Sequence, residues 1–338
     1  MPLEVYVCGP GFGETVVLMW QEGGTRCAAL VDCFAGPRGQ FLISWLQELG
    51  VDHLSFVVAS HPHVDHIFNM YHVLARYQGE IGRFWWWGGM GEIDTITYFR
   101  KLAGKFPENS NHLSARAKAI EQLLIERARQ LTQYGKPPQE IMGEVMAVYP
   151  LPAMAGSALR ALSLSPWADQ RLNYMRIVAE GIKPHGVIED THREMNLISS
   201  ALLVTYGSAQ VVLGGDVEQS NWKDLRNSGR CPALSPCVVK VSHHGSSTGR
   251  IDEMWSEGGF FGRQDRAPVA VLTPWRGTLP EKSVIDEIRG AGCKVCVTGQ
   301  PIGSGRTRPL KSFVHLQVQE NGLADVVEHS ANVAIYDP

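Results

Sequence analysis

The stretch that decides the fold is Ser60-His61-Pro62-His63-Val64-Asp65-His66, which places three imidazoles and one carboxylate within six positions. It follows a largely apolar run, Leu54 to Ala59, that is typical of a buried strand. His61 and His63 are two residues apart on a chain leaving this strand, so both rings can point to one side and share a metal ion. Asp65 and His66 begin the next element and can reach a second ion. The spacing therefore predicts a two-metal site rather than a chance histidine cluster on a surface loop.

Two segments in the second half of the chain offer partners for this cluster. Residues 211–216, Val-Val-Leu-Gly-Gly-Asp, predict a buried strand that ends in two glycines and presents Asp216 at its tip, where a carboxylate can bridge two metals. Residues 237–247 predict another strand that opens into a His-His-Gly-Ser-Ser loop. Either His243 or His244 can complete the shell of the second metal. Each motif alone is weak evidence, but in this order the three support one another.

With these motifs the chain resembles the metallo-β-lactamase superfamily, and within it the hydrolase domain of ComEC-type DNA-internalisation proteins and related secreted nucleases. The resemblance covers most of the chain. Val7 to Glu14 looks like the opening strand and glycine turn, Ala29 to Asp32 like the second strand with a buried aspartate, and Asn196 to Leu203 like the asparagine-serine strand. It implies an α/β protein with a four-layer αβ/βα sandwich, in which the metals lie where strand ends of both halves meet.

The resemblance also implies roles for individual residues. The first metal would be held by His61 and His63, the second by Asp65, His66 and His243 or His244, and Asp216 would bridge them. Asp65, Asp216 and His244 would be the catalytic residues, and Asp32 would orient the ligating rings. The expected cofactors are two divalent metal ions: the imidazoles favour zinc, and manganese is the alternative.

Two segments depart from the pattern of the family. The superfamily commonly draws a third histidine for the first metal from upstream of the bridging aspartate, where this chain offers only His185 and His192 outside any recognisable motif, and Asn196 in the equivalent place. The ComEC-like branch usually carries a histidine-containing loop where this chain has Gly277-Thr278-Leu279-Pro280.

The composition is that of a globular protein with a large core. The 338 residues are 44% hydrophobic and 19% charged, with a formal net charge of −3, and we expect one elaborated domain over residues 1–338. No segment approaches the roughly 20 uncharged apolar residues of a membrane span, and the first residues read as a strand rather than a signal peptide, which favours the cytoplasm. The seven cysteines suit reduced, buried thiols, and Cys293 and Cys296 are interpreted as structural.

The segment from about 88 to 194 is the most individual part of the chain and is interpreted as a helical insertion. Apolar residues recur in it at helical spacing. Between Arg100 and Lys136 there are eight Lys or Arg residues against three Glu. This basic excess either guides a polyanion to the metals or is a solvated helix face, and the segment is also a candidate docking face for a protein partner. Just before it, Trp85-Trp86-Trp87 favours core packing over a platform for stacking bases.

Three functions are consistent with these patterns. The first is a metal-dependent phosphodiesterase or nuclease acting on nucleic acid, because donors near the metal loop suit phosphate oxygens: Lys240, Ser246, Ser247 and Thr248. The second is a hydrolase of a small ester, thioester, lactone or cyclic nucleotide. The third is a metal-binding sensor or interaction protein with little turnover. The ligand pattern separates the first two poorly, because one fold hosts many reactions.

Overall fold

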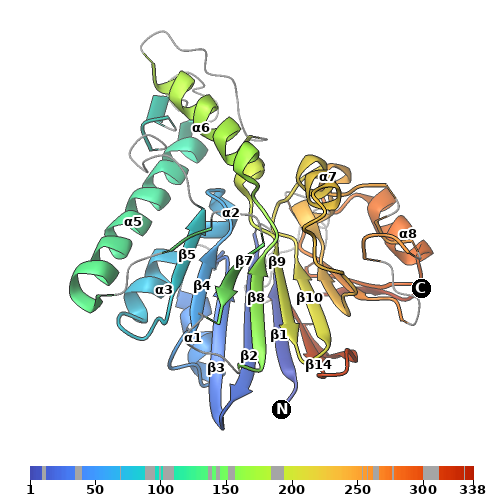
Figure 1. The fold of residues 1–338 in the computed structure, drawn as a ribbon. Helices are drawn as coiled ribbons and strands as arrows, with labels where there is room; N and C mark the ends of the chain where they lie inside the picture. Colours follow the sequence, from blue (N-terminus) through green and yellow to red (C-terminus); the bar gives the residue numbers. More distant parts are fainter. Residues whose placement is uncertain are drawn as a thin grey trace.

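Two eight-stranded mixed sheets pack face to face in the computed structural model (Figure 1). It describes residues 1–9, 13–34, 40–68, 70–87, 96–98, 100–101, 110–135, 139–141, 145–150, 157–183, 194–252, 254–256, 258–261, 266–275, 278–299, 312–330 and 332–338. In spatial order the first sheet contains β15 (Ala324–His329), β14 (Phe313–Val318), β1 (Leu3–Cys8), β2 (Thr15–Glu22), β3 (Thr25–Val31), β4 (Phe56–Ala59), β5 (Phe84–Trp87) and β6 (Gln139–Ile141). The second contains β16 (Ala334–Tyr336), β13 (Lys294–Val297), β12 (Val269–Leu272), β11 (Val238–Lys240), β10 (Ala209–Leu213), β9 (Leu202–Tyr206), β8 (Leu159–Ser163) and β7 (Met146–Tyr149).

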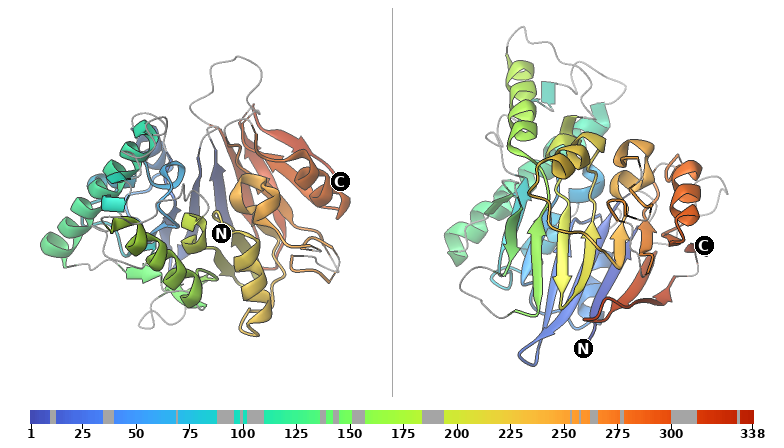
Figure 2. Two further views of the ribbon diagram at one scale, coloured as in Figure 1. Left: turned by 90° about the horizontal axis from the view of Figure 1, so that it is seen from above. Right: turned by 45° about the vertical axis from the view of Figure 1, so that its right-hand side comes forward.

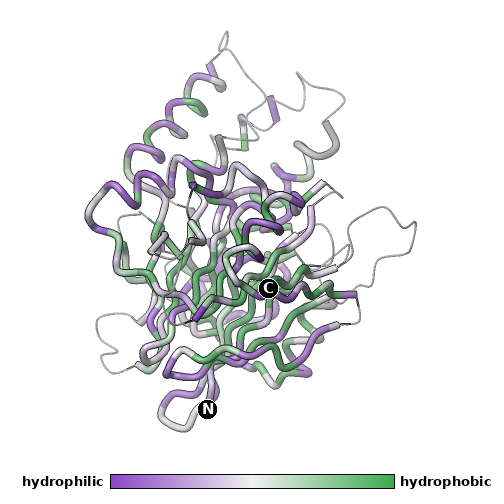
Figure 3. Tube along the Cα trace, turned by 90° about the vertical axis from the view of Figure 1, so that its right-hand side faces the viewer, coloured by the Kyte–Doolittle hydropathy of each residue, from purple (hydrophilic) through white to green (hydrophobic). Residues whose placement is uncertain are grey.

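Helices cover the outer face of each sheet (Figure 2). Four helices share a core with the first sheet: α1 (Gln40–Glu48), α3 (Met70–Arg76), α5 (Ser110–Tyr134) and α6 (Ala168–Ile182). α7 (Gln219–Asn227) and α8 (Lys282–Gly290) cover the second. A third core lies between the sheets and is rich in valine and leucine, which pack well on pleated surfaces. Hydrophobic residues accordingly follow the strands, and hydrophilic residues gather on the outer helices (Figure 3). The four-layer αβ/βα sandwich is therefore confirmed.

The parallel strands of both sheets determine where the predicted site can form. β3, β4, β5 and β6 run parallel in the first sheet, and β10, β11, β12 and β13 do so in the second. Asp32 follows β3, the His-rich stretch follows β4, and Asp216 and His244 lie in the loops after β10 and β11. Ligands of α/β sheets bind outside the carboxyl ends of the strands, and here these ends come from both sheets.

The predicted elements and the observed ones differ in two places. The sequence that follows the His-rich stretch predicts one helix from Asp65 to about Tyr77, whereas the structure divides it into α2 (Val64–Ile67) and α3. The apolar runs predict that residues 1 to about 87 supply the strands of the first sheet, whereas in the structure β14 and β15, from the end of the chain, join this sheet beside β1. β1 is thereby covered on both edges.

The segment from 88 to 194 contains α5 and α6, as the helical pattern predicted, but it also supplies strands to both sheets. β6 pairs with β5 at one edge of the first sheet, and β7 and β8 extend the second sheet beyond β9. In Figure 1, α6 projects above the sandwich and α5 runs down its side next to α3, whereas β7 and β8 are part of it. The description of this segment as a helical insertion is therefore incomplete. Within the described residues, no helix is long and apolar enough to cross a membrane.

Several basic residues of this segment contact other side chains of the protein, either in its interior or at its surface. Arg116 is 1% exposed, and the guanidinium of Arg127 lies 4.3 Å from the ring centre of Trp86. Arg100 pairs with Glu121 at 3.0 Å, and Arg129 pairs with Glu126 at 2.6 Å. Lys105 and Lys136 lie outside the described residues. The basic excess seen in the sequence is therefore not a continuous exposed face on α5.

The tryptophans and cysteines have the structural roles that the sequence predicted. All four residues of β5 are buried; Trp85 faces the core between the sheets, and Trp86 and Trp87 face the helices. All seven cysteines are free thiols, and five of them are buried. Cys293 packs in the core beneath α8, whereas Cys296 packs between the sheets, so the two thiols lie on opposite faces.

Candidate metal centre

The loop after β4 and the tip of β10 bring a first group of donors together. His61 and His63 are 0% and 7% exposed, and His61 Nε2 lies 2.8 Å from His63 Nδ1. Asp216 Oδ2 lies 3.6 Å from His61 Nε2 and 3.8 Å from His63 Nδ1. These three side chains form a buried group that can hold one metal ion.

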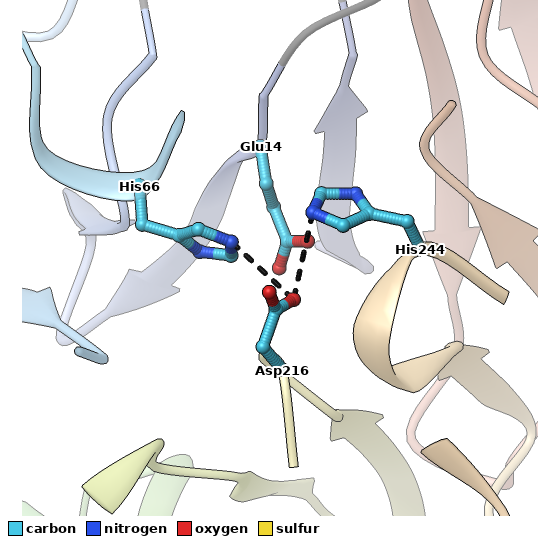
Figure 4. A group of neighbouring side chains, drawn as sticks. All are labelled: Glu14, His66, Asp216 and His244. Carbon is cyan, nitrogen blue, oxygen red and sulfur yellow. Dashed lines mark ion pairs between the residues drawn. The ribbon is translucent and has the colours of Figure 1, made fainter. Parts of the chain in front are cut away.

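A second group shares Asp216 with the first (Figure 4). Asp216 Oδ1 lies 3.3 Å from His66 Nε2 and 3.6 Å from His244 Nε2. Glu14 completes the group, and its four ligand atoms lie within 4.8 Å of one another. The two oxygens of Asp216 thus face different groups, which is the geometry of a bridging carboxylate.

Asp65 lies beside the second group. Its Oδ2 is 3.0 Å from His244 Nε2 and 3.5 Å from His66 Nε2. The structure therefore brings together five of the candidate site residues: His61, His63, Asp65, His66 and Asp216.

Of the two adjacent histidines, the structure brings His244 into the site and not His243. His244 Nδ1 lies 3.1 Å from the carbonyl oxygen of Thr273, and donating its proton there leaves Nε2 to face the carboxylates. His243 Nδ1 instead lies 3.0 Å from Thr248 Oγ1 and 3.6 Å from Glu218. Both residues have left-handed backbone angles, with φ of 47° and 53°, so the chain turns sharply and their side chains diverge. The sequence leaves the choice between His243 and His244 open, and the geometry favours His244.

Asp32 orients the metal loop, as the resemblance implied. Its carboxylate accepts hydrogen bonds at 2.7 Å from the Ser60 backbone N–H and the Ser60 hydroxyl, and lies 2.7 Å from His66 Nδ1. A carboxylate at Nδ1 holds a proton there and directs Nε2 toward the second group.

The first group gains no further histidine within the described residues. Asn196 Nδ2 donates to Glu218 at 3.1 Å, and its Oδ1 is buried without a hydrogen bond. His185 and His192 lie outside the residues that the structure describes.

Two residues of the site were missed as site residues in the sequence, Glu14 and Thr273. Glu14 was seen only as part of the opening strand and turn, although a carboxylate between a glycine turn and an apolar strand is a buried charge that needs a partner. That partner is Lys240, which is 0% exposed and forms an ion pair with Glu14. Lys240 therefore points inward rather than toward a phosphate. Ser247 is likewise engaged, because its backbone N–H and hydroxyl donate to Glu281 at 2.8 and 2.9 Å.

Burial and neighbouring charges shift the pKa values of the site histidines in different directions. Burial lowers the pKa of His63 to about 4, and it also lowers the pKa of His61. Burial acts the same way on His66, but Asp216, Asp32 and Asp65 outweigh it and hold the pKa of His66 well above its ordinary value. Burial raises the pKa of Asp216, but His66 and His244 reverse the shift and hold it low. His61 and His63 are thus neutral near pH 7, the form in which imidazole binds metals.

The residues present fit a pair of divalent cations. His66 Nε2 and Asp216 Oδ1 are buried and make no hydrogen bond, although they face each other. Buried polar atoms are nearly always satisfied, so such atoms indicate a missing ligand. Imidazole nitrogens with carboxylate oxygens suit zinc or manganese.

Comparisons with known proteins agree with this fold. Residues 9–85, which include Asp32 and the His-rich stretch, match the family model of the metallo-beta-lactamase superfamily. The two mixed sheets form the sandwich that is typical of that superfamily. No curated protein matches the chain.

Three solved structures are similar at low sequence identity. The metallo-beta-lactamase fold protein YhfI from Bacillus subtilis is 16% identical, with a TM-score of 0.43, over 89% of this chain and 98% of that one. Zn²⁺-bound PqqB from Methylobacterium extorquens is 11% identical, with a TM-score of 0.41, over 86% and 97%. The short form of human tRNase Z is 11% identical, with a TM-score of 0.36, over 80% and 92%.

Proposed function

We propose that this chain of metallo-β-lactamase fold is a dinuclear metal-dependent hydrolase that acts on phosphodiesters, as a nuclease or phosphodiesterase of the ComEC-like branch. The observation that carries the proposal is Asp216, whose two oxygens face two separate groups of buried donors. One metal would be held by His61, His63 and Asp216, and the other by His66, Asp216, His244 and Asp65. Two such cations, when bound, lower the pKa of a water molecule toward neutrality and stabilise negative charge on the attacked group.

Hydrogen bonds within the chain orient the ligands. Asp32 and Thr273 hold the Nδ1 atoms of His66 and His244, so both rings present Nε2 to the carboxylates. Burial raises the pKa of Asp65, but His66 and His244 outweigh it and keep the carboxylate ionised. Asp65 is therefore an acceptor at neutral pH and can orient an attacking water molecule.

Two observations bear on whether the phosphodiester is a nucleic acid or a small molecule. Resemblance to the ComEC-like branch supports nucleic acid. The engagement of Arg116, Arg127 and Lys240 inside the protein instead favours a small phosphodiester, such as a cyclic nucleotide, because these charges do not form a track for a polyanion. We further propose that the protein is cytoplasmic and that a protein partner binds the outer faces of α5 and α6.

The test is turnover by protein loaded with Zn²⁺ or Mn²⁺ on single-stranded DNA, duplex DNA, RNA, a cyclic nucleotide, a chromogenic phosphodiester, a lactone and a thioester. We expect hydrolysis of at least one phosphodiester that is abolished in Asp216→Asn. Hydrolysis of lactones or thioesters alone would move the function to the small-ester class. Metal binding without any turnover would support a sensor and overturn the enzymatic proposal.

A further inference from the structure

Glu14 reaches the second donor group from the hairpin of β1 and β2. Its side chain is 1% exposed, and Figure 4 shows the carboxylate between the rings of His66 and His244, close to Asp216. The Glu14 backbone N–H donates to the carbonyl oxygen of Asp65 at 3.0 Å, which ties the hairpin directly to the metal loop.

Gly13 makes this approach possible. A Cβ atom at this position would lie 2.5 Å from the carbonyl oxygen of Asp65 and 2.2 Å from Cγ of Phe34, distances that real Cβ atoms do not show. A side chain at residue 13 would therefore push Glu14 away from the site, and the glycine serves close backbone contact here.

Two neighbours hold one oxygen of the Glu14 carboxylate. Lys240 forms its ion pair with Oε2, and the Thr273 hydroxyl donates to the same oxygen at 3.4 Å. A carboxylate oxygen of Glu14 also lies within 4.8 Å of the ligand atoms of the other three donors of the group, His66, Asp216 and His244.

The ion pair between Glu14 and Lys240 does not by itself explain why both charges are buried. Replacing a buried ion pair by apolar residues is often neutral or stabilising, because desolvation of the charges offsets their attraction. A carboxylate that lies beside three other metal donors can itself bind a metal ion. Lys240 supplies the positive charge that a buried carboxylate requires.

We propose that Glu14 is an additional ligand of the second metal, held in place by Lys240 and Thr273. This rests on the proposed function. The second site then has three carboxylates, from Glu14, Asp65 and Asp216, and two imidazoles, from His66 and His244. Five protein donors exceed the tetrahedral set that zinc prefers and suit a six-coordinate, oxygen-favouring ion such as Mn²⁺. The first site, with two imidazoles and one carboxylate, keeps the character of a zinc site.

The test is metal binding by the full chain without substrate. Metal-free protein is titrated with MnCl₂ or ZnSO₄, and bound metal is measured by calorimetry and by elemental analysis after dialysis. Four proteins are compared: wild type, Glu14→Asp, Glu14→Gln with Lys240→Met, and Glu22→Gln. Glu14→Asp keeps the charge but withdraws the carboxylate by one methylene. The double variant removes both members of the ion pair, so no lone charge stays buried. Glu22 is the matched control, because it accepts hydrogen bonds at the opposite end of β2.

We expect wild type and Glu22→Gln to bind two equivalents of metal with the same affinities. Both Glu14 variants should keep the first equivalent and bind the second about 10- to 100-fold more weakly, with the greater loss for Mn²⁺. Two equivalents at wild-type affinity in the double variant would overturn the role of Glu14 and leave the proposed function intact. A wild-type protein that binds no metal would overturn both.

Discussion

Asp32→Asn tests whether the hydrogen bonds behind the metal ligands control the site. The substitution keeps the shape of the side chain, and asparagine tolerates the left-handed backbone of this residue, where φ is 57°. Oδ1 can still accept from the Ser60 backbone N–H. The amide NH₂ that replaces Oδ2 cannot accept from the Ser60 hydroxyl or from His66 Nδ1, both now at 2.7 Å.

The expected loss of unfolding free energy follows from the two hydrogen bonds that the substitution removes. A hydrogen bond to a charged group contributes about 1.5–3 kcal/mol, so metal-free Asp32→Asn should lose about 3–6 kcal/mol of unfolding free energy. Facing an NH₂ group, His66 is driven to place its proton on Nε2, the atom that should bind metal. Metal affinity should therefore fall about 10- to 100-fold, as for other residues that orient metal ligands.

Urea denaturation of the metal-free protein and competition with a chromophoric chelator measure the two effects. Asp52→Asn makes the same chemical change on an exposed residue and should alter neither. Unchanged metal affinity in Asp32→Asn would show that Asp32 does not control the His66 ring, whatever its effect on stability.

Three other predictions concern the site, the long helix and a remote histidine. His63→Ala should lose the metal of the first group and all hydrolysis, whereas His72→Ala on α3 should keep both; elemental analysis with equal metal in the two variants would contradict the assignment. Arg127→Gln should lower the unfolding free energy by about 0.5–2 kcal/mol, because it removes the cation above the ring of Trp86; a urea midpoint equal to that of wild type would refute this. Burial lowers the pKa of His315 below 6.5, so the folded protein binds fewer protons and loses stability as pH falls from about 6.5 through the lower folded pKa. His315→Gln should therefore show a smaller fall in melting temperature between about pH 7 and pH 5 than wild type, and parallel curves for the two proteins would exclude the effect.

The central strands and the loops that follow them could be predicted because both leave local patterns. An apolar run marks a strand buried on both faces, and a polar motif at its end marks the loop that emerges from the sheet. β4 with the His-rich stretch, β10 with Asp216, and β11 with His244 all follow this rule. Order along the chain was then enough to place these loops together, since parallel strands direct their carboxyl ends to one edge.

The edges of the sheets could not be predicted in the same way. β6, β7 and β16 have three or four residues each, too few for a period to be recognised. β14 is a well-formed apolar strand, but its partner β1 lies about 300 positions earlier in the chain. Pairing across such a separation is decided by the whole sandwich and leaves no local pattern. The sequence leaves the choice between His243 and His244 open for a similar reason, because it depends on a left-handed turn that allows only one ring to reach Thr273.

The charge on α5 shows why composition alone misleads about binding surfaces. Counting Lys and Arg treats every cation as exposed, yet a guanidinium can lie over an aromatic ring or be buried with its charge satisfied. Arg127 stacks on Trp86 because β5 presents a large ring to the helix that covers it. The same tryptophan therefore explains both the absence of a base-stacking platform and part of the missing basic face.

The site also couples the two sheets to each other. His61, His63 and His66 are carried by the first sheet, whereas Asp216 and His244 are carried by the second. Neither sheet alone has a complete donor group, since Asp216 belongs to both groups. A bound cation would therefore fasten the strand ends of one sheet to those of the other, and metal binding should stabilise the sandwich as a whole rather than one loop. Glu14 and Lys240 extend this link, because their ion pair joins the hairpin of the first sheet to β11 of the second. The contacts that assemble the candidate metal centre thus also hold the carboxyl strand ends of the two sheets together.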